Sequence, residues 1–318
     1  MTESENNRCV MRCGGSIRRL TSLWSTYNER IRMPLGICDQ CGHVQIARLP
    51  QAREVAVLNK QLFDNTFDPT TADTRSSEHD SKGETIVNRL AAVVGDKGGG
   101  LLLDVGAGEG WSQSVAQHFG FDYHVVEPDP DLAARLKARG ATIASGGIED
   151  LVPEGWSQQF KVIILRHALE HLLDPIGDLA TLAQCLAPDG ILYVALPNFT
   201  KARPKAGFRT DYLRPVHISY FTPNKLDWCL HSAGLKAHSI KDEYELWAIA
   251  DQGLTPVKLL DERDDNQGRL SSLIHANRSR DARNIRRILI YRLFVRLPSI
   301  VQRMVRWGRG LLSDSRHH

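Results

Sequence analysis

The apolar residues in the middle of the chain occur in short blocks that alternate with stretches of helical period. The first block, Leu101–Val105, is typical of a strand in a parallel sheet whose two faces are both covered. Later strands are predicted at residues 123–127, 142–144, 161–165, 191–196, 237–241 and 246–250, and helices at residues 112–119, 131–139, 176–186 and 223–233. The alternation predicts an α/β domain with a parallel sheet between helices, and its last two strands, joined by a tight link, predict an antiparallel hairpin.

Segments of different character flank this domain. Residues 1–50 are predicted to form a small cysteine-bearing module, residues 51–89 a connecting segment of helix and loop, and residues 257–318 a basic helical extension. Residues 90–256 remain for the α/β domain. Within the connecting segment, the polar run at residues 68–77 is expected to be a loop.

The carboxyl-terminal segment is strongly basic. Residues 278–318 carry eleven arginines against two aspartates, so the rest of the chain is acidic, because the net charge of the whole is only +3. Apolar residues recur among the arginines, and Pro298 is expected to divide the segment into two helices. Such helices can dock on their own domain or mediate self-association, lie on an anionic membrane, or bind RNA. Docking is favoured, and nucleic acid is least favoured because no RNA-binding module accompanies the segment.

The composition is otherwise that of a soluble globular protein. The hydrophobic fraction of 42% and the charged fraction of 24% are ordinary, and the apolar runs are too short to cross a bilayer. The first residues are acidic and polar, unlike a secretory signal. These features predict a cytoplasmic protein, with peripheral membrane contact left open for the basic segment.

A glycine-rich loop follows the first predicted strand. Gly106, Gly108 and Gly110 form a G-x-G-x-G pattern, which differs from the G-x-G-x-x-G of dinucleotide-binding proteins. Glycines there let the backbone approach a ligand, and ligands of open α/β sheets bind at the carboxyl ends of the strands. The second predicted strand ends in Glu127, whose carboxylate can accept hydrogen bonds from both hydroxyls of a ribose.

These residues resemble the first motif and the acidic second-strand end of class I S-adenosylmethionine (SAM)-dependent methyltransferases. The similarity continues through residues 165–175 and 186–198, and covers about residues 90–253. It implies a Rossmann-like, seven-stranded sheet with a reversed last strand, and SAM as cofactor; a nucleotide-binding domain for another ligand is the alternative. Cofactor contacts are implied for Asp104, Gly106, Ala107, Gly108, Gly110, Glu127, Pro128, Glu149 and Arg166.

The resemblance also implies individual roles for several of these residues. The glycines would line the methionine and ribose moieties, Asp104 would face the amino end, and Glu127 would hold the ribose. Glu149 is a substitute for the aspartate that meets the adenine amine in many relatives, with a solvated loop residue as the alternative.

Four of the six cysteines form two close pairs near the amino terminus. Cys9 and Cys13 are separated by three residues, Cys38 and Cys41 by two, and 24 residues lie between the pairs. Such pairs predict a closed, structural Zn²⁺ site with four thiolate ligands; four reduced thiols in a small core are the alternative. The remaining two, Cys185 and Cys229, are predicted to be buried thiols without chemistry.

Together with the α/β domain, the cysteine module resembles the amino-terminal zinc domain of a group of sugar-modifying methyltransferases. The second pair runs into a glycine and a short apolar strand at residues 42–46, as in that group, whereas the first pair has one extra residue. The resemblance implies that the module helps to cover the acceptor site.

Histidines supply the candidate bases for methyl transfer. Positioning accounts for most of the catalysis, but a hydroxyl or carbon acid also needs a base. His217 lies between the fifth strand and the next helix, where class I enzymes build the acceptor site; packing against that helix is the alternative. His167 is a second candidate, expected to face the methyl donor. Sugar C-methyltransferases carry a Tyr-x-Glu-His run, but here Arg214 and Val216 precede His217, which favours oxygen over carbon as the acceptor.

The sequence thus predicts a zinc-bearing class I methyltransferase that acts on a sugar, glycoconjugate or secondary metabolite. The alternatives are an RNA or protein methyltransferase recruited by the basic segment, and a non-catalytic scaffold of the same fold.

Overall fold

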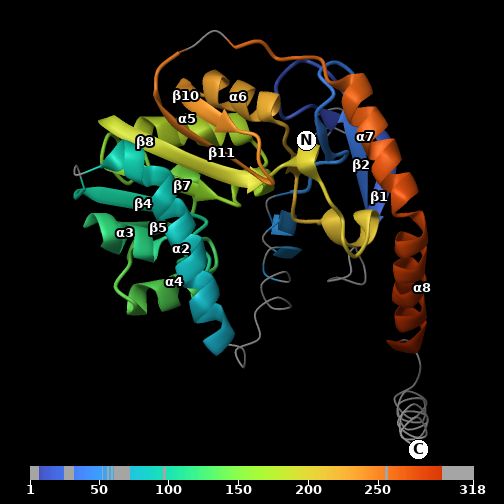
Figure 1. Cartoon of the computed structure of the whole chain (residues 1–318), viewed down its shortest axis with the longest axis horizontal. Coiled ribbons are helices and arrows are strands. Elements are labelled where there is room, and N and C mark those ends of the chain that lie inside the picture. Colours follow the sequence, from blue (N-terminus) through green and yellow to red (C-terminus); the bar gives the residue numbers. More distant parts are fainter. Residues whose placement is uncertain are drawn as a thin grey trace, which may run out of the picture.

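The central feature of the computed structural model is a seven-stranded sheet with strand order β10-β11-β8-β7-β4-β5-β6 (Figure 1). The structure describes residues 7–24, 32–51, 53–55, 57–58, 60, 72–95, 98–254 and 257–295. The strands are β4 (Leu101–Val105), β5 (Asp122–Val126), β6 (Thr142–Ser145), β7 (Phe160–Arg166), β8 (Leu186–Pro197), β10 (Leu235–Lys241) and β11 (Glu245–Gln252). Only β11 is reversed: it pairs antiparallel with both β8 and β10. The predicted parallel sheet and final hairpin are therefore confirmed.

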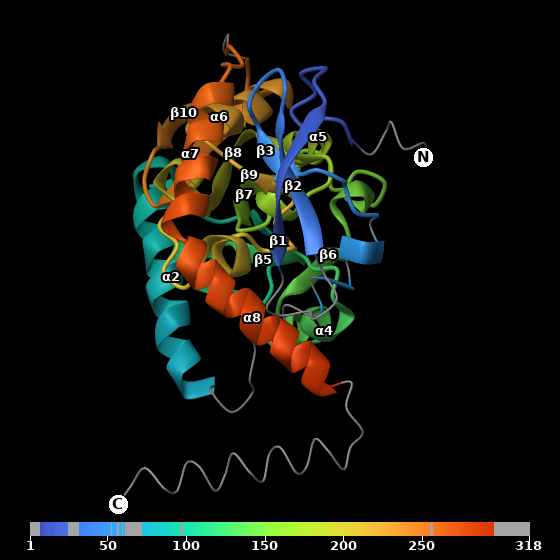
Figure 2. The ribbon, with the colours of Figure 1, turned by 90° about the vertical axis from the view of Figure 1, so that its right-hand side faces the viewer.

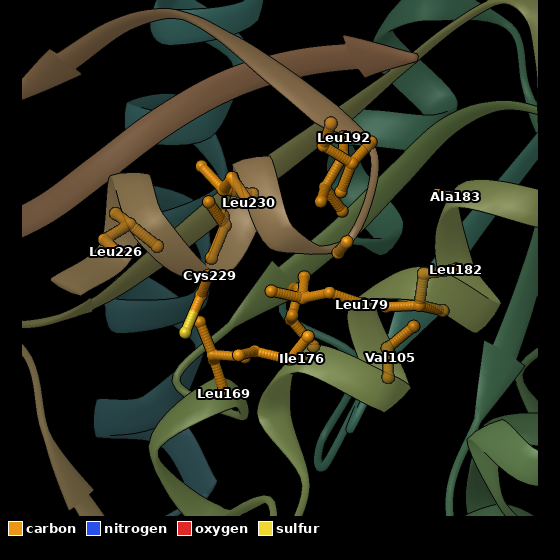
Figure 3. Close-up of a cluster of buried hydrophobic side chains, with 14 of the residues drawn as sticks. Val105, Leu169, Ile176, Leu179, Leu182, Ala183, Leu192, Leu226, Cys229 and Leu230 are labelled. Atoms are coloured by element: carbon orange, nitrogen blue, oxygen red, sulfur yellow. The ribbon is translucent and has the colours of Figure 1, made fainter. Parts of the chain in front are cut away.

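Helices cover both faces of this sheet. Alternate residues of a strand point to opposite faces, and here both sets are apolar, so each face needs a covering layer. They are α2 (Ala72–Val94), α3 (Gln113–Phe119), α4 (Pro130–Ala138), α5 (Pro175–Cys185) and α6 (Pro223–Ser232). Leu103 packs in one buried cluster with α5 and α6, which Figure 3 shows, whereas Leu102 packs in the other cluster with α2, α3 and α4. Side-chain caps begin three of the helices: Asp129 caps α4, Asp174 caps α5 and Thr222 caps α6.

The amino-terminal strands form a second sheet, which the α/β domain completes. Its order is β1 (Ile17–Trp24), β2 (Arg32–Cys38), β3 (Val44–Ile46) and β9 (Ser219–Tyr220). The last of these comes from the segment between β8 and α6. The buried cluster beneath the sheet likewise joins Leu35 and Val44 to Phe199, Phe208 and Leu213. Much of the segment between β8 and α6 therefore packs against the cysteine module.

One local prediction is wrong. The polar run at residues 68–77 was expected to be a loop, but α2 already begins at Ala72; residues 68–71 lie outside the described part of the chain. The first turns of α2 contain few apolar residues, so no hydrophobic period marks them as helical. That period appears only farther along, where Ile86, Leu90 and Val94 are buried.

The carboxyl-terminal arm comprises α7 (Arg263–Ala276) and α8 (Arg278–Val295). Figures 1 and 2 show α7 beside β1 and β2, with α8 continuing from α7 along the same side of the molecule. The two helices meet at buried Asn277. The division expected at Pro298 lies outside the described residues.

Buried polar contacts hold the arm on its own chain. Asn266 donates from its side-chain amide to the Gly42 carbonyl at 3.0 Å. The carboxylate of Asp281, which has no exposed surface, accepts hydrogen bonds from the backbone of Arg209 at 3.1 Å and the hydroxyl of Thr210 at 3.0 Å. Docking on its own chain, the favoured interpretation of the basic segment, is therefore confirmed for the start of α8, and α7, which precedes that segment, is docked as well.

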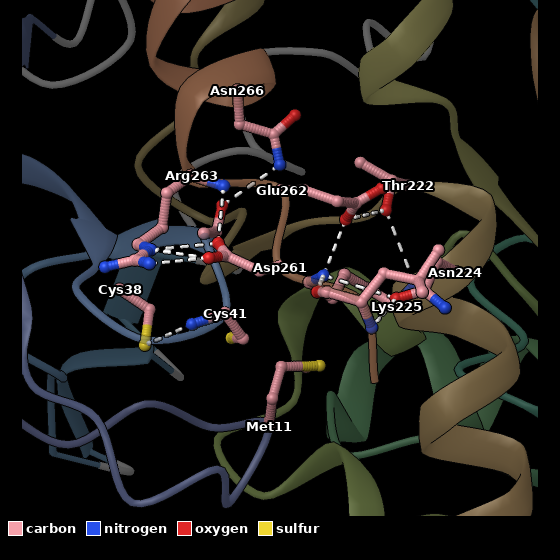
Figure 4. Close-up of polar contacts among 12 residues, drawn as sticks. Met11, Cys38, Cys41, Thr222, Asn224, Lys225, Asp261, Glu262, Arg263 and Asn266 are labelled. Atoms are coloured by element: carbon pink, nitrogen blue, oxygen red, sulfur yellow. Dashed lines mark hydrogen bonds and ion pairs between the residues drawn. The ribbon is translucent and has the colours of Figure 1, made fainter. Parts of the chain in front are cut away.

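A fully buried lysine ties α6 to the connection that precedes the arm. Lys225 Nζ lies 2.6 Å from Glu262 Oε2 and donates to the Leu260 carbonyl at 2.9 Å, as Figure 4 shows.

Within the described ranges, every helix is too short or too polar to span a bilayer.

Gly42 lets the arm approach the cysteine module closely. A Cβ atom there would lie 2.4 Å from the backbone nitrogen of Arg263, and the φ angle of Gly42 is 74°.

We expect Gly42→Ala to lower the free energy of unfolding by about 1–2 kcal/mol for the left-handed backbone and by about 1–3 kcal/mol more for the clash. Gly140→Ala is the matched control, because its φ angle is 91° and no atom lies within 4 Å of the added Cβ. Denaturant unfolding measures both changes; equal losses would contradict the close-approach argument.

Candidate functional site

A glycine-rich turn leaves the carboxyl end of β4. Gly106, Gly108 and Gly110 have φ angles of 68°, 55° and 78°, which glycine adopts without strain. A Cβ atom on Gly106 would lie 3.2 Å from the Cβ of Ala168, and one on Gly110 would lie 2.7 Å from Leu136 Cδ2. The turn therefore requires glycine for its backbone at all three positions, and at Gly110 also for space.

Glu127 follows β5 and faces this turn. Its side chain is buried, Oε2 accepts the N–H of Gly108 at 2.8 Å, and Oε1 accepts the N–H of Asp129 at 2.9 Å. Burial raises the pKa of Glu127. Because a carboxylate oxygen can accept more than one hydrogen bond, Glu127 keeps acceptor capacity for two ribose hydroxyls beside the turn. The residues present thus fit a cofactor that contains a nucleoside, as SAM does.

Asp104 lies buried at the end of β4 and accepts a hydrogen bond from the Tyr123 hydroxyl at 2.7 Å. Burial raises the pKa of Asp104 to about 6, against the opposing effect of hydrogen bonds from Tyr123 and Ser112. This contact joins β4 to β5 beneath the glycine turn. Tyr123 was not recognised as a site residue from the sequence, because a tyrosine in a buried strand gives no separate signal.

The other predicted cofactor residues lie in different surroundings. Ala107 is buried in the turn, and Pro128 is exposed after Glu127. Glu149 is exposed in a short helical turn after β6, and its carboxylate lies 2.6 Å from the position of a Cβ on Gly147. Arg166 ends β7, with Nη2 2.7 Å from Glu245 Oε1. The roles of these residues in cofactor binding stay predictions.

His167 follows β7 and lies between two carboxylates. Its φ angle is 52°; Nε2 lies 2.9 Å from Glu245 Oε1, and Nδ1 lies 3.4 Å from Glu170 Oε1. His167 is exposed, and partial loss of hydration alone would lower its pKa, but the two carboxylates outweigh that effect and raise the pKa of His167 to about 9. His167 is therefore an imidazolium at neutral pH.

His217 has the opposite electrostatic environment. Burial, with a further contribution from His171, lowers the pKa of His217 to about 3. The two imidazole rings are 5.0 Å apart, and ligand atoms of Glu170, His171 and His217 all lie within 4.8 Å of one another. The Ile218 N–H donates to the Glu170 carbonyl at 2.7 Å, which holds this segment against the loop after β7. His217 is thus a neutral imidazole close to the carboxyl end of β7.

Three further charged or polar groups complete the cluster. Glu245 Oε2 lies 2.5 Å from Arg89 Nη1, which also donates to the Tyr193 hydroxyl at 2.7 Å. Sequence reasoning did not include Arg89, Tyr193, Glu245 or Glu170 among the site residues. Only Glu170 gave a local signal, because it lies between His167 and His171 in one short run. The other three come from α2, β8 and β11, which meet only in the folded protein.

The four amino-terminal cysteines converge. Sγ of Cys9 lies 3.7 Å from Sγ of Cys41, Sγ of Cys13 lies 3.4 Å from Sγ of Cys38, and all four sulfurs are within 4.8 Å of one another. A tetrahedral zinc with bonds of about 2.3 Å separates its sulfur ligands by about 3.8 Å. Cys38 Sγ also accepts the N–H of Cys41 at 3.5 Å. The donor set and its spacing fit zinc.

The extra residue in the first cysteine pair is taken up by a left-handed turn. Arg12 has a φ angle of 53° and Gly14 one of 84°, and the Arg12 N–H donates to the Cys9 carbonyl at 3.0 Å. The two other cysteines, Cys185 and Cys229, are buried as predicted, and burial raises the pKa of each thiol.

We expect Glu127→Gln to weaken SAM binding about ten- to a hundredfold, because it replaces a charged acceptor, and such hydrogen bonds contribute about 1.5–3 kcal/mol each. Asp122→Asn is the matched control: it removes one carboxylate from the exposed start of the same strand. Isothermal titration with SAM gives both affinities. Equal affinities for the two variants would show that Glu127 does not hold the ribose.

Comparison with known proteins agrees with this geometry. Residues 79–240, just over half of the chain, match the family described as "Methyltransferase domain". Two curated relatives are the ubiquinone biosynthesis O-methyltransferases of Caulobacter sp. (strain K31) and Caulobacter vibrioides, each 29% identical over 137 residues, which is 40% of this chain and 51% of the relative. The chain therefore spans about half the length of the curated relatives it matches.

The chain is also similar to solved structures at low sequence identity. The 1,6-didemethyltoxoflavin-N1-methyltransferase of Burkholderia thailandensis, solved with S-adenosylhomocysteine, is 18% identical with a TM-score of 0.48, over 68% of this chain and 97% of that one. The PH0226 protein of Pyrococcus horikoshii OT3 is 15% identical with a TM-score of 0.46, over 58% and 99% of the two chains. From the strand order, the glycine turn and the family match together, the chain belongs to the methyltransferase domain family and has the class I SAM-methyltransferase fold.

Proposed function

We propose that this protein transfers the methyl group of SAM to a hydroxyl oxygen of a small-molecule acceptor, namely a sugar, glycoconjugate or secondary metabolite. The observation that carries the proposal is that a glycine turn with buried Glu127 follows the carboxyl end of β4, while the segment with the neutral imidazole of His217 packs against the loop after the neighbouring strand β7. The curated relatives are named as O-methyltransferases, which supports oxygen over carbon or nitrogen.

Different residues of the chain would bind the cofactor, hold the acceptor and accept the proton. When bound, the cofactor supplies an electrophilic methyl group on a sulfonium. The glycine turn and Glu127 orient the cofactor, and the segment that bears His217 holds the acceptor in line with it. Such positioning supplies most of the rate enhancement. His217 accepts the hydroxyl proton as the acceptor oxygen attacks.

Protonation distinguishes the two histidines that the sequence offered as bases. A base must be neutral before it accepts a proton, and the pKa of His217, about 3, keeps it neutral at physiological pH. His167 has a pKa of about 9 and is already protonated there. We therefore assign proton transfer to His217. The imidazolium of His167 positions Glu170 and Glu245 and adds positive charge close to the site.

The alternative functions depend on the carboxyl-terminal arm. Recruitment of RNA or protein, or contact with a membrane, requires basic residues of α8 to face outward, and Arg283, Arg286 and Arg287 are exposed. However, Asn266 of α7 and Asp281 of α8 contact buried groups of the same chain, so the arm packs on the cysteine module and stabilises it. A small-molecule acceptor therefore remains the proposed substrate class, and contacts of the arm with other partners stay predictions.

Methyl-tritiated SAM, incubated with the protein and with aqueous metabolites, lipids, RNA and protein from a cell extract, tests the proposal. We expect label in aqueous metabolites or lipids. We expect His217→Ala to lower the rate about 10²–10⁴-fold while SAM binding is retained. His238→Ala is the control, because His238 is an exposed histidine on β10. Label found only in RNA or protein would contradict the small-molecule assignment, and no label in any fraction would favour the scaffold.

The pH dependence of the rate tests the choice of base. With His217 as the base, kcat/KM stays level from about pH 6 to pH 8, because His217 loses its proton far below that range. A rate that rises towards pH 9 would instead point to His167. A requirement for an added divalent cation would also contradict the role of His217, because the nearby ligand atoms of Glu170 and His171 could then share a metal with it.

We also propose that the four cysteines bind one structural Zn²⁺. Four sulfur ligands leave no open coordination position, so the metal would stabilise the module and take no part in the methyl transfer. Its effect on the active site would pass through β3, which pairs with β9 two residues beyond His217.

Metal analysis of the purified protein is expected to give one zinc per chain. We expect Cys38→Ser to lose the metal and most of the activity, whereas Cys185→Ser, which changes a buried cysteine on α5, keeps both. SAM affinity should change little in Cys38→Ser, because the glycine turn belongs to the other sheet. Full zinc content in Cys38→Ser, or its absence in the unaltered protein, would refute the assignment.

A further inference from the structure

Arg214 occupies a fixed backbone position beside the proposed base. Its carbonyl accepts the His217 N–H at 3.1 Å and the Tyr220 hydroxyl at 3.3 Å. The neighbouring side chains of Leu213 and Val216 are buried in the protein. These contacts restrict the backbone at Arg214, so the Cα atom from which its side chain extends has a fixed position.

Arg214 is half-buried and begins the backbone turn that leads to His217. Burial is the main cause of the low pKa of His171 and of His217, and the charge of Arg214 lowers both further. It also acts on the pKa of Tyr220, in the direction that offsets burial. Arg214 therefore contributes positive charge at the place where the acceptor would react.

Other arginines around the site have partners within the protein. Arg89 and Arg166 both pair with Glu245, Arg209 lies 3.5 Å from Asp281, and Arg269 donates to the Thr200 carbonyl at 2.6 Å. By contrast, the side chain of Arg214 makes no hydrogen bond or ion pair with any residue in the described ranges.

The nearby carboxylates make their described ion pairs with other side chains. Glu170 Oε1 faces His167 while Glu170 Oε2 is buried without a hydrogen-bond partner among the described residues, and Glu245 is shared among Arg89, Arg166 and His167. A partly desolvated cation without a counter-charge is unfavourable. A bound ligand with a negative charge would supply the counter-charge that Arg214 lacks.

We infer that Arg214 binds an anionic group, a phosphate or a carboxylate, carried by the methyl acceptor. The inference rests on the proposed function and narrows its substrate class to acidic small molecules. A guanidinium binds either oxyanion through two parallel hydrogen bonds, which would fix the direction of the acceptor as well as its affinity. The carboxylate of the cofactor is a less suitable partner, because Arg214 lies after β8, whereas the glycine turn lies after β4, with β7 between these strands.

The charge of the labelled product tests the inference directly. The product formed from methyl-tritiated SAM and an aqueous metabolite extract is applied to an anion-exchange column before and after phosphatase treatment. Retention that phosphatase abolishes indicates a phosphate, and retention that phosphatase leaves unchanged indicates a carboxylate. A product that passes through without retention overturns the inference.

Variants locate the anion on Arg214. We expect Arg214→Gln to raise the half-saturating amount of the acceptor fraction at least about tenfold, with the maximal rate and the SAM affinity nearly unchanged. Arg214→Lys should recover part of the loss. Arg203→Gln, which removes an exposed arginine from the same segment, is the matched control. Unchanged saturation in Arg214→Gln, or a loss of SAM affinity instead, overturns the inference.

Titration with inorganic pyrophosphate in the presence of SAM tests the site without turnover. Binding that is lost in Arg214→Gln and kept in Arg203→Gln supports an anion site even if no methyl transfer is found, in which case only the proposed function fails. If no label is transferred and pyrophosphate binding does not depend on Arg214, both proposals fail.

Discussion

The pairing of β3 with β9 is the contact on which the site depends. Val44 pairs with Tyr220 and Gln45 with Ser219, and the Ile46 N–H donates to the Ile218 carbonyl at 2.9 Å. On its other side, the same segment is held by the Glu170 carbonyl. His217 therefore lies where two rigid parts of the protein meet, and its position requires both sheets. A side chain fixed in this way loses little entropy when a ligand binds.

Buried charges specify how the remaining parts assemble. Lys225 and Asp281 have no exposed surface, and each is satisfied by groups distant in sequence. A buried charge without its partner is strongly unfavourable, so alternative placements of the arm would leave these groups unpaired. The apolar clusters supply the bulk of the stability, whereas these polar contacts define where the arm joins the cysteine module.

Local sequence patterns were sufficient for the features that depend on short-range geometry. The strands of the seven-stranded sheet, the glycine turn and the two cysteine pairs were predictable because each is encoded within a few consecutive residues, and Glu127 was predictable because it ends one of those strands. Glu245 was not, because β11 is reversed, so the first residue of this strand lies at the edge where β7 and β8 end. The joining of β9 to the cysteine module was also hidden, since two paired residues give no periodic signal. Protonation of the two histidines likewise depends on neighbours that only the fold supplies.

The separation of β3 from β9 along the chain also has a consequence for biosynthesis. Ser219 lies more than 170 positions after Ile46, and ribosomes add about 5–20 residues per second, so the edge of β3 waits on the order of ten to thirty seconds for its neighbour. An unpaired edge strand is open to wrong partners during that interval. The four cysteines, all made within the first 41 residues, can organise the nascent module early. The segment that carries His217 then adds to a sheet already formed, as its last strand.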